Sequence, residues 1–296
     1  LSVRSGDLAF LYERGAGFHG LYAVATEAFF DSNDVVAASD SSLAVGAQWP
    51  LRVLLKCAHY FPKPVPEDLL FSTPAYENAF WIWAYRKVQG ARGCNPLTPE
   101  AAQALVELLV KVNGSAQDFV GFRPYVRPDT ARDPALPSLA ENKAVALEDI
   151  LRGYLVHRLG KDHGEGLAQA FGSPEDVEWY ANNIPYHISG KIIDILSFHT
   201  NFRYTQMPLR YRYCVAELKK GPCEGRAVSQ VLRYSQWVAG RLAGGEVEMV
   251  QPIIIAREFP EEALRKARES EFNTRGVLLV AYQVVHSDTL HFSVVQ

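Results

Sequence analysis

Cysteine is scarce in this chain, and long apolar runs are missing. The four cysteines, Cys57, Cys94, Cys214 and Cys223, stand far apart and form no Cys-x-x-Cys pair, which argues against a zinc site. We expect them to be reduced thiols in a cytoplasmic protein. No stretch approaches the roughly 18 apolar residues of a membrane helix, so we expect no membrane partner. No basic segment followed by an apolar run marks a secretory signal.

An excess of positive charge is also lacking. The formal net charge is −3, which argues against a protein that coats nucleic acid through bulk charge but leaves room for a local basic face. Up to residue 118 the chain has 9 Lys and Arg against 12 Asp and Glu, and the remainder has 21 of each. The acidic excess therefore belongs to the first part of the chain.

Apolar residues are plentiful, at 48% of 296, which excludes wholesale disorder and suggests two domains. Four prolines punctuate a stretch without periodicity that is rich in Asp, Arg and Ser, and this composition is typical of a linker. We therefore predict a domain over residues 1–118, a linker over residues 119–140, and a second domain over residues 141–296.

The first domain is predicted to be rich in strands. Alternating or continuous apolar runs indicate strands over residues 8–12, 20–29 and 49–55. A helix should begin at Pro99 with Thr98 as its N-cap and end at Gly114.

The second domain alternates between helical and extended patterns, which predicts an α/β (α+β) fold with a mixed sheet flanked by helices. The expected helices cover residues 139–159, 226–242 and 260–271, and the expected strands cover residues 190–198, 211–218, 249–256, 276–286 and 290–295.

Three charged residues in this second domain point to metal chemistry. Asp194 interrupts an apolar strand, where an unpaired carboxylate is costly to bury. Glu217 and Lys219 are two residues apart on another strand and so share one face. If the two strands are neighbours, Asp194 and Glu217 form a pair of oxygen ligands suited to Mg²⁺, with Mn²⁺ as a substitute. Lys219 would orient water or stabilise charge on a phosphate. A lone Glu-x-Lys pair, however, is more often a surface ion pair.

The sequence around these residues resembles the PD-(D/E)xK nuclease superfamily. Asp194, then Glu217-Leu218-Lys219, then a helix with Gln230, Tyr234 and Trp237 is similar to the catalytic domain of archaeal and actinobacterial mismatch endonucleases. The similarity covers residues 140–285. It implies metal ligation by Asp194 and Glu217, with Lys219 and Gln230 as further catalytic residues.

Two further residues are weaker members of this set. Glu148, in Leu147–Leu151, resembles the glutamate of the family's entry helix, which can join the metal site. A solvated helix acid is the alternative, and Glu141 is a rival for the role. Tyr234 is either a substrate contact or a packing residue.

The segment between the Asp194 strand and the Glu217 strand is longer than a tight hairpin needs. It is rich in aromatic and basic residues, with Arg203 as the candidate substrate contact. Arg and Tyr bind phosphates and stack on bases, so we expect a DNA-facing loop. An ordinary elaborated hairpin is the alternative.

The first domain resembles EVE domains of the PUA-like superfold. The similar segments are Gly6–Tyr12, Gly20–Phe29, Trp49–Val53 and Val88–Thr98, within residues 5–114. The resemblance implies a PUA-like β-barrel that holds one flipped base in an aromatic cage. EVE domains usually have a strand and a helix before the Gly-Asp turn, where this chain has only residues 1–5, so we expect that segment to be missing or supplied otherwise.

Aromatic residues of the first domain are the candidates for such a cage, because a flipped base needs stacking partners. Packing in the core is the alternative for each one. Asp31, Asp34 and Asp40 could border a loop or accept a hydrogen bond from a cytosine amino group. The aromatic candidates are Phe18, Tyr22, Trp49, Trp81 and Trp83.

Together these features predict a modification-dependent restriction endonuclease. The first domain would recognise a modified base in double-stranded DNA, such as a 5-substituted cytosine, and the second would hydrolyse a nearby phosphodiester bond. Because cutting two strands takes two active sites, we expect a homodimer. A repair endonuclease acting on mismatched or branched DNA is the first alternative, and a catalytically inactive nucleic-acid-binding module is the second.

Overall fold

The protein is described by a computed structural model that covers residues 3–31, 51–89, 94–119, 127–133, 145–161, 163–187, 190–201, 209–286 and 289–295. Its backbone contacts divide the chain into two compact units. The first unit comprises residues 3–81 and 97–135, and the second comprises residues 82–96 and 136–296. No helix among the described residues is both long enough and apolar enough to cross a membrane.

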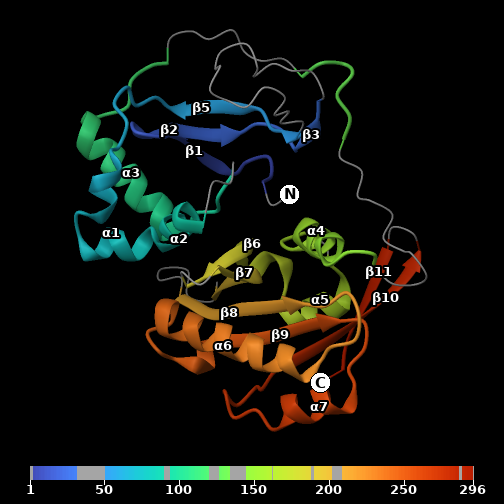
Figure 1. Cartoon of the computed structure of the whole chain (residues 1–296). Helices are drawn as coiled ribbons and strands as arrows, with labels where there is room; N and C mark the ends of the chain where they lie inside the picture. Colours follow the sequence, from blue (N-terminus) through green and yellow to red (C-terminus); the bar gives the residue numbers. More distant parts are fainter. Residues whose placement is uncertain are drawn as a thin grey trace. The chain divides into compact units, whose positions relative to one another are not determined.

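The first unit contains an open antiparallel sheet of β1 (Leu8–Glu13), β2 (Gly17–Val24) and β5 (Leu55–His59), in that order (Figure 1). A separate pair is formed by β3 (Phe29–Phe30) and β4 (Leu51–Arg52). The predicted strand over residues 20–29 is thus broken after Val24. No closed barrel is formed by the described residues, and the first two residues of the predicted third strand lie outside them.

Helices complete this region of the chain. The predicted helix is confirmed as α3 (Pro99–Asn113): Thr98 caps it by accepting a hydrogen bond from the Ala101 N–H at 3.3 Å, and Gly114 ends it at φ 81°. The other helical segments before α3 are η1 (Glu67–Phe71), α1 (Pro74–Ala79) and α2 (Trp81–Gln89), and α2 belongs to the second unit from residue 82 on.

Part of the predicted linker belongs to the first unit. The backbones of Phe30 and Arg132 exchange two hydrogen bonds, at 2.7 and 2.9 Å, so residue 132 extends the pairing of β3. Residues 120–126 and 134–144 lie outside the described residues.

The second unit is built on a mixed sheet, as predicted; it has six strands, one more than expected, in the order β11-β10-β9-β8-β7-β6. The two central pairings, β8 with β9 and β9 with β10, are parallel, and the outer pairings are antiparallel. The strands are β6 (Val177–Tyr186), β7 (Lys191–Asn201), β8 (Leu209–Leu218), β9 (Val250–Ala256), β10 (Leu278–His286) and β11 (Thr289–Val294).

Helices cover both faces of this sheet. On one face, α4 (Glu148–Arg158) and α5 (Gly164–Phe171) pack on a buried cluster that includes Ile195, Ala216 and Ile253. On the other face, α6 (Gly225–Leu242) lies along β8 and β9 (Figure 1). The remaining helical segments are η2 (Pro174–Asp176), η3 (Val247–Met249) and α7 (Glu261–Arg268).

The strand register explains why two acids meet at one place. Ile195 of β7 pairs with Ala216 of β8, and both side chains lie in the cluster beneath α4 and α5. Because side chains alternate along a strand, the next pair in this antiparallel register, Asp194 and Glu217, turns to the opposite face. The two acids therefore lie side by side on the α6 side of the sheet.

Candidate active site

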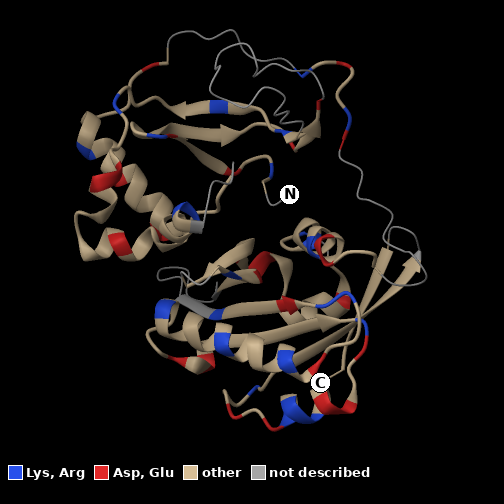
Figure 2. Ribbon diagram, in the orientation of Figure 1, with Lys and Arg blue, Asp and Glu red and all other residues tan. Residues whose placement is uncertain are grey.

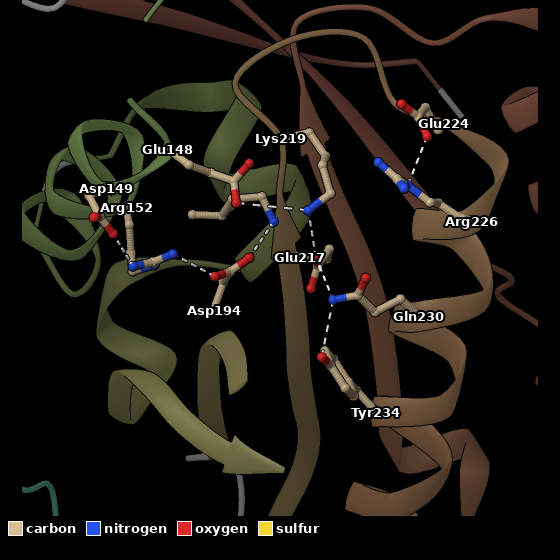
Figure 3. Close-up of polar contacts among 11 residues, drawn as sticks. Glu148, Asp149, Arg152, Asp194, Glu217, Lys219, Glu224, Arg226, Gln230 and Tyr234 are labelled. Atoms are coloured by element: carbon tan, nitrogen blue, oxygen red, sulfur yellow. Dashed lines mark hydrogen bonds and ion pairs between the residues drawn. The ribbon is translucent and has the colours of Figure 1, made fainter. Parts of the chain in front are cut away.

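Five polar side chains from four elements converge at the ends of β7 and β8 (Figure 3). All five were expected from the sequence. Four lie within these elements: Glu148 in α4, Asp194 in β7, Glu217 in β8 and Gln230 in α6. The fifth, Lys219, directly follows β8, and its backbone N–H still donates to the Ile255 carbonyl of β9 at 2.9 Å. This hydrogen bond holds the backbone of Lys219 beside β9.

Asp194 is buried, with 7% of its surface exposed, and both of its oxygens accept hydrogen bonds. The backbone N–H of Leu218 donates to Oδ2 at 2.8 Å, and Arg152 Nη2 donates to Oδ1 at 2.8 Å. A carboxylate oxygen has two lone pairs, so each oxygen retains capacity for another partner. Arg152, which also pairs with Asp149, is a member of the site that the sequence analysis missed.

Glu217 is more deeply buried, at 2% exposed. Its Oε1 accepts from Lys219 Nζ at 2.7 Å and from Gln230 Nε2 at 2.8 Å. Its Oε2 is buried and has no hydrogen-bond partner among the described residues. Burial raises the pKa of the Glu217 carboxyl to about 7, and the neighbouring charge of Asp194 adds to the rise.

Lys219 carries the positive charge between these acids. Burial lowers the pKa of its ammonium group, but the carboxylates around it, Glu217 first, more than offset this and raise the pKa above its ordinary value. Glu148 Oε1 lies 3.8 Å from Lys219 Nζ, and its side chain is the more exposed of the two acids that pair with the lysine. Glu148 is therefore at the rim of the site.

The α6 residues support Glu217 from the side. Gln230 Nε2 also contacts the Tyr234 hydroxyl at 3.1 Å, so the two residues, one turn apart, form a short chain that ends on Glu217. Tyr234 is 2% exposed, and its ring lies 4.7 Å from that of Tyr186 between centroids. Burial raises the pKa of the Tyr234 hydroxyl. Tyr234 therefore packs in the core and touches the site only with its hydroxyl.

The donor set fits a hard divalent cation. Asp194 and Glu217 offer oxygens on one face of the sheet, and the unpartnered Glu217 Oε2 is a buried acceptor that a cation would satisfy. No three His, Cys, Asp or Glu side chains in the described part of the chain gather into a group that could hold a metal ion. Mg²⁺ suits a site of two carboxylates, because it keeps several waters or substrate oxygens as its other ligands.

The aromatic candidates of the first domain are not brought together in this way. Phe18, Trp81 and Trp83 are almost fully buried, at 3%, 2% and 5% exposed, and Tyr22 of β2 is half-buried. Trp81 and Trp83 stand two residues apart in α2, and residues at that spacing do not share a helix face. Trp49 lies outside the described residues.

Other predicted residues have ordinary partners or fall outside the described chain. Asp31 is buried and accepts a hydrogen bond from Arg52 Nη1 at 2.6 Å. Outside the described residues lie Asp34, Asp40, Glu141 and Arg203.

Comparisons of this chain with family models, with curated proteins and with solved structures found no match.

Proposed function

We propose that the second unit is a Mg²⁺-dependent DNA endonuclease of the PD-(D/E)xK type. The observation that supports this most is the buried, unpartnered Oε2 of Glu217 beside Asp194, with Lys219 on the same carboxylate. An uncompensated acceptor in a buried acidic pair is costly in a merely structural role. It is expected where a cation completes the site.

Each residue then has a task that follows from its contacts. Asp194 and Glu217 would hold Mg²⁺, which when bound withdraws electron density from a phosphate oxygen and makes a water molecule more acidic. Gln230 keeps Glu217 in place through its 2.8 Å hydrogen bond, and the Leu218 N–H does the same for Asp194. Lys219 stays protonated because Glu217 stabilises its charge, so it would donate to the phosphate and stabilise negative charge in the transition state.

The proposed substrate is double-stranded DNA, bound by a homodimer whose first unit recognises a modified base. Among the aromatic candidates that the structure describes, Tyr22 offers the largest exposed fraction for stacking. Phe18, Trp81 and Trp83 would have to leave the core to contact a base. We therefore place Tyr22 first among the candidate base contacts.

The test is a cleavage assay with the full chain on plain, methylated, hydroxymethylated and mismatched duplexes. We expect Mg²⁺-dependent cutting that EDTA abolishes and that Asp194→Ala lowers by at least about 10³-fold, with DNA binding retained. Glu175→Gln, at an exposed acid away from the site, is the matched control and should cut normally. Cutting by the Asp194→Ala variant at the wild-type rate would refute the proposal. Preference for mismatched over modified duplexes would favour the repair alternative.

A further inference from the structure

Helix α6 has an unusual charge composition for a helix at the surface of this protein. Its 18 residues include three arginines, Arg226, Arg233 and Arg241, and no acid. The arginines are spread over the length of the helix, from its first turn to its last (Figure 2). By contrast, the short helix α7 carries both signs, and its Arg265 and Arg268 pair with Glu269 and Glu261.

The three arginines lie on one flank of α6. At 3.6 residues per turn they fall within an arc of about 80°, and Gln230 lies inside the same arc. On the other exposed flank, Ser229, Leu232, Gln236 and Gly240 are all uncharged. Since Gln230 reaches Glu217, the arginine flank is the one that faces the candidate active site.

These charges are also available to a partner. Arg233 is exposed and Arg241 is partly exposed, and within the described part of the chain neither is in an ion pair. The Arg226 side chain is 82% exposed and pairs with Glu224 at 2.8 Å. Such an exposed pair contributes little, so it does not prevent Arg226 from binding an anion.

We propose that this flank of α6, the arginine row, binds the phosphates of the DNA strand that leads into the active site. The inference rests on the proposed function and adds the path of the substrate. From Arg226 to Arg241 the helix rises about 22 Å, and a strand of B-DNA carries one phosphate per roughly 3.4 Å of axis, so the row spans about six phosphates. The strand would therefore run parallel to α6, past Gln230.

The experiment measures binding rather than cleavage. The affinity of the full chain for a fluorescein-labelled plain duplex is followed by anisotropy in EDTA over a range of about 50 to 200 mM salt, where each phosphate contact adds about 0.9 to the slope of log K against log salt. We expect the Arg233→Gln/Arg241→Gln double variant to lower the slope by about 2 and to weaken binding roughly 60-fold at about 0.1 M salt. Both side chains lie at the surface, so the fold should be kept.

The matched control is Arg265→Gln/Lys266→Gln on α7, which removes the same charge from another exposed helix. An equal change of slope in both double variants would overturn the proposal, as would no binding of duplex by the wild type. Binding of an acidic protein but not of DNA would also overturn it. Wild-type cleavage with an unchanged slope would refute the arginine row alone, whereas a lowered slope without any cleavage would refute the nuclease alone.

Discussion

The polar candidates of the second unit and the aromatic candidates of the predicted first domain rest on different kinds of sequence evidence. The structure brings the polar candidates together but not the aromatic ones. Lys219 and Gln230 both donate to the Glu217 carboxylate, and Asp194 accepts from the backbone N–H of Leu218, between Glu217 and Lys219. The described aromatic candidates are mainly core residues distributed over β2 and α2. Spacing along strands and helices thus predicted which polar side chains lie together, whereas residue type alone did not predict a cluster of aromatic residues.

The physical reason is that the polar pattern limits where its side chains can lie, whereas an aromatic residue type does not. Glu-x-Lys at the end of a strand fixes the side of the sheet on which both side chains lie, and an acid in an otherwise apolar strand requires a compensating partner. An aromatic residue requires only burial, which the core provides as well as a cage does.

The largest loss of cleavage is expected from a substitution of Glu217. Glu217→Gln keeps the shape but removes the charge that holds Lys219, and we expect cleavage to fall by about 10³-fold. Glu148→Gln, at the exposed rim and 3.8 Å from Lys219, should lower it by less than about 10². Single-turnover rates on one duplex provide the measurement. Equal losses would show that burial in the site is not what makes Glu217 important.

The second test asks whether Trp81 and Trp83, the two tryptophans of α2, are core residues or line a cage. Trp81→Ala and Trp83→Ala should each lower the free energy of unfolding by about 3–5 kcal/mol, because a buried aromatic ring is removed. Tyr22→Ala should cost less, since Tyr22 is half-buried. Urea unfolding followed by circular dichroism distinguishes them. A tryptophan variant of normal stability that loses preference for modified DNA would reverse our assignment.

Two glycines in helices of the second unit test how closely those helices pack on the sheet. A Cβ on Gly166 of α5 would lie 1.9 Å from the Phe292 carbonyl oxygen of β11, so Gly166→Ala should cost about 1–3 kcal/mol. A Cβ on Gly153 of α4 meets nothing within 4 Å, so Gly153→Ala should stabilise by about 0.5–1 kcal/mol. Thermal unfolding measures both. Similar shifts from the two substitutions would contradict the close contact of α5 with β11.

The last test concerns His199, a buried polar residue outside the site, whose effect on stability appears only below neutral pH. Burial lowers its pKa from 6.5 to about 3, and the charges of Arg212 and His163 act in the same direction. In this pH range the unfolded chain therefore binds a proton at His199 that the folded chain does not bind. The free energy of unfolding should fall as pH decreases from about 6.5 toward about 3. His199→Gln should flatten this dependence relative to His291→Gln, at an exposed histidine, without changing cleavage. Parallel stability–pH curves for the two variants would contradict this.

Much of the second unit follows from its sequence because its patterns are strong. The apolar run around Asp194 predicts β7, and the periodic apolar face after Glu224 predicts α6 within one residue at its start. Missed elements have weak patterns. The edge strand β6 mixes polar and aromatic residues and has Asn183 at φ 56°, and α5 is short and contains glycines.

Arg152 was missed for another reason. Its contact with Asp194 joins residues 42 positions apart, which no local pattern encodes. The available signal was its place four residues after Glu148, which puts both on one face of α4. The prediction at the start of this helix was wrong for residues 145–147, because α4 begins at Glu148, and residues 139–144 lie outside the described residues.

The central claim is that Asp194 and Glu217 together hold a divalent cation, and Mn²⁺ binding tests it without relying on activity. Titration of the full chain with Mn²⁺, followed by the electron paramagnetic resonance signal of the free ion, should show one saturable site in the wild type and in Glu175→Gln. The site should be lost in Asp194→Asn and in Glu217→Gln, because each variant removes one charged ligand. Undiminished binding of Mn²⁺ by either of these two variants would contradict the account.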